Sequence, residues 1–139
     1  RFKVLNDKEQ KLKLYYEVKN TGLYDKHLSM YKISENLSTQ NYELGRMMAF
    51  PSGWLENSSI WLHMSYKFYL ELLKSGFHSV FWREAKDGMV CFMDPNVYGR
   101  SPIEAASFIV SSSFPDAEMH GSSFEARLTG ATAEFLNMW

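Results

Sequence analysis

Several side chains in one short stretch have the chemistry of a sugar site beside an anion site. The residues Pro51-Ser-Gly form a turn, and Trp54, Glu56 and Asn57 follow it. A tryptophan ring packs on the apolar face of a pyranose, while a carboxylate and an amide bond to its hydroxyl groups. His63 follows Glu56 after about two turns of helix. Near a helix N-terminus, an imidazole can donate a hydrogen bond to an anion.

The same residue types also fit a purely structural interpretation. Glu56 can complement the dipole of the following helix, and His63 can begin a solvated stripe that continues through Lys67, Glu71 and Lys74. Residue type alone leaves both interpretations open.

A second stretch, Arg127-Leu-Thr-Gly-Ala-Thr, has the chemistry of a phosphate site. Thr129 and Gly130 would place a hydroxyl beside the free backbone N–H groups of a helix start, and the glycine would allow an anion to approach closely. Many helices begin with Thr and Gly as plain caps, so this dipeptide does not by itself establish a site.

The composition excludes several classes of partner. The chain has 139 residues and a net charge of −1, from 15 basic and 16 acidic residues, which favours neither nucleic acid nor an anionic membrane. No apolar run approaches the roughly 20 residues of a membrane span. The single Cys91 excludes an internal disulfide and suits a reducing compartment, so we predict a cytoplasmic protein. His27, His78 and His120 lack the spacing of metal ligands, so no metal site is predicted.

The periodicity of apolar residues predicts a mainly helical chain with little strand. Helices are expected over residues 7–19, 24–31, 58–74 and 101–110, and from Thr129 or Gly130 onward. Ser58 or Ser59 would cap the third of these, and Ser75-Gly76 would end it. This helix is apolar almost all round, which indicates packing on several sides. Residues 135–139 show no stop signal, so we expect a piece of a larger domain, truncated at both ends.

At these stretches the sequence resembles the cellobiose phosphorylase group, glycoside hydrolase family 94. The likeness runs from about residue 3 to the end. The matching runs are Gly45-Arg-Met-Met-Ala-Phe-Pro-Ser-Gly-Trp-Leu-Glu-Asn-Ser-Ser-Ile-Trp-Leu-His63, Asp94-Pro-Asn-Val-Tyr-Gly-Arg-Ser-Pro102 and Arg127-Leu-Thr-Gly-Ala-Thr-Ala-Glu-Phe135.

This resemblance implies part of an (α/α)6 barrel catalytic domain, of which residues 1–139 would be the C-terminal part. Enzymes of this family cleave a β-glycosidic bond with inorganic phosphate, invert the anomeric centre and release an α-sugar 1-phosphate. They use no metal or organic cofactor, because phosphate is the co-substrate. The expected partners are a disaccharide or oligosaccharide, phosphate and the rest of the same chain, with a homodimer left open.

The resemblance also assigns roles to individual residues. It implies that Glu56 contacts the acceptor sugar, with Trp54 and Asn57 beside it, and that His63, Thr129 and Gly130 hold phosphate. The general acid, an aspartate, is expected upstream of these motifs, so no catalytic residue is assigned here and we expect the isolated chain to be inactive.

The chain departs from the family pattern at two positions. Arg100 stands where many members carry Gln or Glu shortly before the Thr-Gly motif, and Arg127 stands where many carry an aromatic residue. Two alternatives to a phosphorylase therefore stay open. One is a glycoside hydrolase on the same barrel, which needs a second carboxylate roughly 6.5–9.5 Å from the acid. The other is a non-catalytic helical sugar-binding protein.

Overall fold

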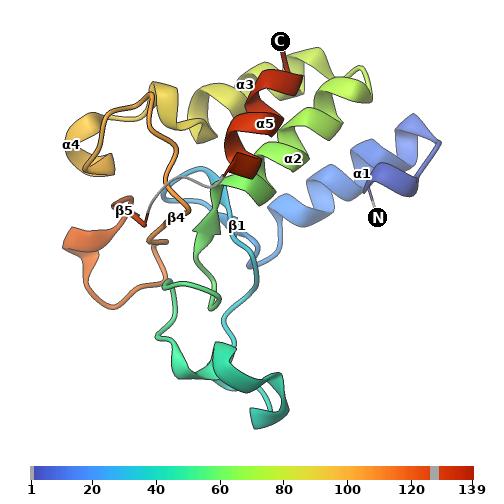
Figure 1. Cartoon of the computed structure of the whole chain (residues 1–139). Coiled ribbons are helices and arrows are strands. Elements are labelled where there is room, and N and C mark those ends of the chain that lie inside the picture. The colour runs from blue at the N-terminus through green and yellow to red at the C-terminus, as the bar shows by residue number, and fades with distance from the viewer. Residues whose placement is uncertain (1, 126–128) are drawn as a thin grey trace.

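The computed structural model describes residues 2–125 and 129–139, of which about half lie in helices (Figure 1). The α-helices are α1 (Lys8–Lys19), α2 (Leu62–Lys74), α3 (His78–Gly88), α4 (Pro95–Tyr98) and α5 (Thr129–Asn137). The 3-10 helices are η1 (Phe2–Val4), η2 (Tyr42–Ala49), η3 (Val90–Phe92) and η4 (Ala117–Met119). The strands are β1 (Tyr24–Asp25), β2 (Met30–Tyr31), β3 (Ile60–Trp61), β4 (Phe108–Ile109) and β5 (Ser123–Phe124). The prediction of a mainly helical chain is confirmed.

Helix α2 forms the centre of the helical layer, where it packs against α3 and α5 (Figure 1). Its buried side chains include Leu62, Tyr66, Tyr69 and Leu72, which join the main core. Met64 is the one large apolar side chain of this helix that is exposed. The described elements themselves therefore cover most of α2, although its sequence indicated a need for further protein around it.

Helix α2 begins later than predicted, at Leu62 instead of Ser58 or Ser59. Ile60 and Trp61 pair with Ile109 and Phe108 of β4, and β5 continues this antiparallel sheet on the other side of β4. An extended backbone at residues 60–61 is incompatible with a helix there. The predicted end of the helix is confirmed, because Ser75 is its C-cap.

The helix predicted over residues 24–31 is wrong, because this segment is a small antiparallel hairpin of β1 and β2. The buried Asp25 carboxylate accepts hydrogen bonds from the backbone N–H groups of His27 and Leu28. Aspartate that bonds to the backbone two and three residues on stabilises a turn in competition with a helix.

The helix predicted over residues 101–110 is also wrong. The hydroxyl of Tyr98 donates to the carbonyl of Glu104 at 2.6 Å and accepts from the N–H of Ala106 at 2.8 Å. Ser101-Pro-Ile-Glu104 has the sequence pattern of a capping box, which favours a helix start, but the Glu104 side chain pairs with Arg100 instead. The chain then continues into β4, while the short helix α4 forms upstream with Asp94 as its N-cap.

Two predicted helices agree with the structure. Helix α1 is capped by the Asp7 side chain, which accepts from the N–H of Glu9, and Asn20 is its C-cap. Helix α5 spans Thr129–Asn137, in agreement with a predicted start at Thr129 or Gly130. Arg127, at which the chain departs from the family pattern, lies outside the described residues. Among residues 2–125 and 129–139, no helix is long and apolar enough to cross a membrane.

Candidate functional site

The first turns of α2 and α5 meet at His63 and Gly130. A Cβ atom placed on Gly130 would lie 3.4 Å from Cβ and 3.9 Å from Cδ2 of His63. Thr129, the first residue of α5, is exposed beside this contact. Two segments that are far apart in sequence, each predicted to bind phosphate, therefore come together, and the glycine places no side chain between them.

The imidazole of His63 carries an unused hydrogen-bonding group. Its Nδ1 atom is buried and has no hydrogen-bond partner among the described residues. Burial, and then the charge of Lys67, lower the pKa of His63, while Glu134 opposes this shift. A neutral imidazole still has one N–H to donate, so His63 can bond to an anion without first becoming charged.

The start of α5 adds a favourable field for an anion. The first backbone N–H groups of a helix have no partner within the helix, and the helix dipole places partial positive charge there. Gly130 lies in this first turn and the Thr129 hydroxyl is accessible. The arrangement is chemically suited to an oxyanion that contacts backbone N–H groups, a hydroxyl and an imidazole together.

The loop before α2 is organised by aromatic packing around Trp54. Its ring contacts Phe124, Phe108 and Phe114, at centroid distances of 4.6, 5.2 and 5.6 Å. The side chain is half-buried. Much of the ring that was predicted to stack on a sugar is therefore packed against the protein itself.

The two polar residues of this loop are both engaged by the chain. Arg46 binds the Glu56 carboxylate through two nitrogens, with Nε at 2.9 Å from Oε2 and Nη2 bonded to Oε1. Asn57 is fully buried, and its amide accepts from the N–H of Leu37 at 3.0 Å and donates to the carbonyl of Phe50 at 2.8 Å. In this structure Asn57 orders the loop, and Glu56 forms an ion pair.

The backbone of the loop is strained. Leu55 and Ser58 adopt left-handed conformations, with φ of 45° and 54°. Gly53 has φ of 83°, and a Cβ atom on it would lie 2.5 Å from the backbone N of Phe114. Residues held in such conformations cost free energy and concentrate at functional sites. The strain therefore makes this loop a candidate for a functional site.

Trp61 connects the loop with His63. Its indole N–H donates to the carbonyl of Leu55 at 2.9 Å, and its ring centroid lies 5.8 Å from that of His63. It also stacks on Phe108. Sequence reasoning treated Trp61 only as an apolar helix residue, because its pairing partner in β4 is distant in the chain.

Arg46 and Glu134 are two further residues of this region that the sequence did not single out. Arg46 belongs to η2, and no local pattern indicates that it reaches Glu56. Glu134 lies one helical turn after Gly130, so the spacing of four could have placed it on the face that meets His63.

A second polar cluster surrounds the buried Glu84 of α3. Tyr15 and Lys19 bond to its Oε1 at 2.5 and 2.8 Å, and Tyr31 bonds to its Oε2 at 2.7 Å. Burial and then the nearby Glu84 raise the pKa of Tyr15 and Tyr31. Burial alone would lower the pKa of Lys19, but its bond to Glu84 raises it. Every group in this cluster has a protein partner, so it acts as a tie between α1, β2 and α3.

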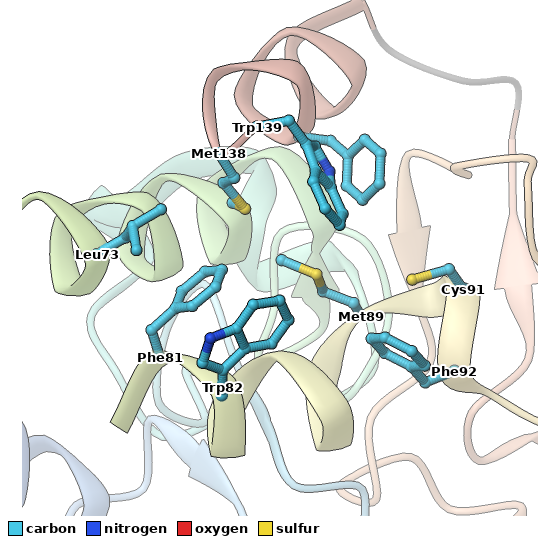
Figure 2. A pocket seen from close by; sticks show the side chains of 9 residues that line it. Leu73, Phe81, Trp82, Met89, Cys91, Phe92, Met138 and Trp139 are labelled. Atoms are coloured by element: carbon cyan, nitrogen blue, oxygen red, sulfur yellow. The ribbon is translucent and has the colours of Figure 1, made fainter. Parts of the chain in front are cut away.

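An apolar hollow of about 90 Å³ lies between α2, α3 and the end of α5 (Figure 2). Its lining is Leu73, Phe81, Trp82, Met89, Cys91, Phe92, Phe135, Met138 and Trp139. The thiol and two indoles are its only polar side-chain groups, so the hollow does not suit a phosphate or a sugar.

Within the part of the chain that the structure describes, no group of three or more His, Cys, Asp or Glu residues could hold a metal ion. Comparisons with protein-family models and with curated proteins find no match for this chain.

Proposed function

We propose that this chain is part of an inverting disaccharide phosphorylase and forms the acceptor-sugar and phosphate wall of its site within an (α/α)6 barrel. The observation that carries the proposal is the close approach of His63 and Gly130, where an imidazole whose Nδ1 has no partner among the described residues meets the start of α5. The resemblance to glycoside hydrolase family 94 supports the same residues.

In the proposed reaction, a phosphate oxygen attacks the anomeric carbon as the glycosidic C–O bond breaks. An aspartate upstream of these 139 residues in the full-length protein protonates the leaving oxygen. The residues described here hold phosphate through His63, Thr129 and the first N–H groups of α5. Fixing the nucleophile in this way lowers the entropic barrier and stabilises charge without a metal ion.

A non-catalytic sugar-binding protein is the second candidate. The ion pair of Glu56 with Arg46 and the internal hydrogen bonds of Asn57 occupy polar groups that either protein would use to bind sugar, so these contacts do not distinguish the two candidates. A non-catalytic sugar-binding protein has no reason to bind inorganic phosphate, so phosphate binding separates the two candidates.

The deciding experiment is calorimetric titration of the chain with inorganic phosphate, comparing His63→Ala with His78→Ala. His78 is a suitable control because it is exposed and is the first residue of α3. Loss of a hydrogen bond to a charged group weakens binding about tenfold, so we expect this loss for His63→Ala and none for His78→Ala.

Equal affinities in all three proteins would mean that phosphate binds adventitiously, and the phosphorylase proposal would then fail. The isolated chain should show no phosphorolysis of cellobiose, because the general acid is expected outside it. Measurable release of glucose 1-phosphate by the chain alone would contradict that assignment.

A further inference from the structure

The loop of residues 38–49 leaves the body of the protein next to Glu56. Its two ends, at Leu37 and Phe50, meet at the Asn57 side chain. The Asn57 amide bonds to the N–H of Leu37 and to the carbonyl of Phe50, so a single side chain joins the two ends of the loop. The loop is the teal segment that projects from the lower part of the molecule in Figure 1. Loops of this length with closed bases are often functional.

The loop itself is only loosely packed. No residue of η2 is buried, and Tyr42 is 88% exposed. Gly45 interrupts η2 with φ of 70° and ψ of −140°, and a Cβ atom there would meet nothing within 4 Å. Few buried contacts and a kinked backbone are the features of a segment that opens at low free-energy cost.

The second half of this loop is held by the ion pair between Arg46 and Glu56. The Arg46 side chain is 78% exposed, whereas that of Glu56 is 23% exposed. The pairing is two-pronged and therefore geometrically specific. An exposed arginine nevertheless contributes little to stability, so this contact can be released readily.

We propose that the pair of Arg46 and Glu56 is a latch, which holds the 38–49 loop closed and keeps the Glu56 carboxylate occupied. Asn57 and Glu56 are adjacent, so the buried Asn57 fixes the base of the loop while Glu56 holds Arg46 within it. That a sugar would bind the freed carboxylate rests on the proposed function. The existence of the latch does not depend on that function.

Hydrogen exchange of residues 41–50, measured by mass spectrometry on the 139-residue chain, tests the latch. The variants are Arg46→Ala and the matched control Arg100→Ala, which removes another exposed arginine–glutamate pair, with Glu104. We expect exchange of this segment to become about two- to five-fold faster in Arg46→Ala and to be unchanged in Arg100→Ala. Unchanged exchange in Arg46→Ala, or equal acceleration in both variants, would overturn the latch.

Salt provides an independent check, because it screens exposed ion pairs. Raising NaCl from about 0.05 to 0.5 M should accelerate exchange of residues 41–50 in the wild type toward the rate of Arg46→Ala, while leaving that variant unchanged. A wild-type rate that does not respond to salt would contradict the latch.

Cellobiose binding separates the latch from the function. If Glu56 binds sugar, Arg46→Ala should bind cellobiose about two- to five-fold more tightly than the wild type, and high salt should abolish that difference. If exchange responds as expected but neither protein binds cellobiose, the latch stands and the sugar site fails. If the wild type and Arg46→Ala bind cellobiose equally, Arg46 does not compete for Glu56 and the occupancy part of the latch is wrong.

Discussion

The surroundings of Glu84 and of His63 show two ways in which this protein places a polar group beside its core. The Glu84 carboxylate accepts hydrogen bonds from Tyr15, Tyr31 and Lys19 and is almost completely buried. The His63 imidazole, by contrast, has a buried Nδ1 atom without a partner among the described residues.

This difference indicates different roles. A buried charge is tolerated when its hydrogen-bonding capacity is filled, and it then holds its surroundings in one arrangement. The buried Nδ1 of His63 has unfilled hydrogen-bonding capacity among the described residues, and it lies near Gly130 and the exposed Thr129, which the proposed function assigns to phosphate. The Glu84 cluster therefore resembles a structural tie, and the His63 region resembles a site.

The largest effect should come from removing the carboxylate of the tie. Glu84→Ala removes the acceptor to which Lys19 and the Tyr15 and Tyr31 hydroxyls donate, so we expect a loss of about 3–5 kcal/mol in the free energy of unfolding. Urea denaturation measures this loss. Glu17→Ala, which removes an exposed pair with Lys13, should cost less than about 0.5 kcal/mol.

Glu84→Gln keeps the shape of the side chain and should lose less stability than Glu84→Ala. Its free energy of unfolding can still be measured if the alanine variant does not fold. Similar small losses in all three variants would show that the buried cluster contributes no more than a surface pair. The contrast with His63 would then disappear.

Gly130→Ala should affect binding more than folding. The added Cβ would sit 3.4 Å from Cβ of His63, which is an ordinary contact, and alanine favours a helix. We expect the free energy of unfolding to change by less than about 1 kcal/mol, and phosphate affinity to fall about tenfold because the methyl group covers the N–H groups that an anion would approach.

Calorimetry and urea denaturation of the same samples check both parts of this prediction. Ala133→Ser, at an exposed position of α5, is the control and should leave phosphate affinity unchanged. If Gly130→Ala strongly lowers the free energy of unfolding but binds phosphate with the wild-type affinity, the contact between α2 and α5 serves packing and not binding.

The sequence was informative about the helices whose ends are set locally. Asp7 caps α1 with its own side chain and Ser75 ends α2, and both signals act within a few residues. The start of α2 could not be predicted, because Ile60 and Trp61 are extended by pairing with β4, which is far away in the chain. Likewise, Tyr98 overrides the capping signal at Ser101 through two hydrogen bonds.

The candidate site shows the same division between local chemistry and tertiary contacts. Residue types nominated His63, Thr129 and Gly130, but only the packing of α2 on α5 brings them together. Arg46 on Glu56 was not foreseeable, since an exposed arginine can reach many partners and its position depends on how the 38–49 loop folds back. Burial of Asn57 depends equally on that loop.

The pKa of His63 reports on the surroundings of its imidazole. Burial, and then Lys67, should place its pKa below the ordinary value of about 6.5 in the free chain, as measured by NMR. Lys67→Met should raise this pKa, and Glu134→Gln should lower it further. Added phosphate should raise it, because an anion favours the charged imidazole.

The pH dependence of stability follows from the same shift. A pKa that is lower in the folded state than in the unfolded state means that protons bind the unfolded chain more tightly. His63 therefore leaves stability unaffected well above its unfolded pKa and reduces it as the pH falls toward 5. His63→Gln should lose less stability than the wild type between pH 8 and 5, and identical slopes would show that the imidazole is not held in the predicted environment.

The smallest effect tests whether an unpartnered buried atom is enough to indicate a site. The Tyr69 hydroxyl also lacks a partner among the described residues. It is enclosed by the core and lies so close to Gly88 that a Cβ on Gly88 would be 2.0 Å from it.

Tyr69→Phe removes no hydrogen bond, so the free energy of unfolding should stay the same or rise by up to about 1 kcal/mol. In contrast, Tyr66→Phe loses the bond that its hydroxyl accepts from the N–H of Val90 and should cost about 1 kcal/mol. Urea denaturation compares the two variants. A loss of about 2 kcal/mol for Tyr69→Phe would reveal a partner for its hydroxyl. The expected result would show that a buried atom without a partner does not by itself indicate a site, so the proposal for His63 depends on its approach to Gly130 and Thr129.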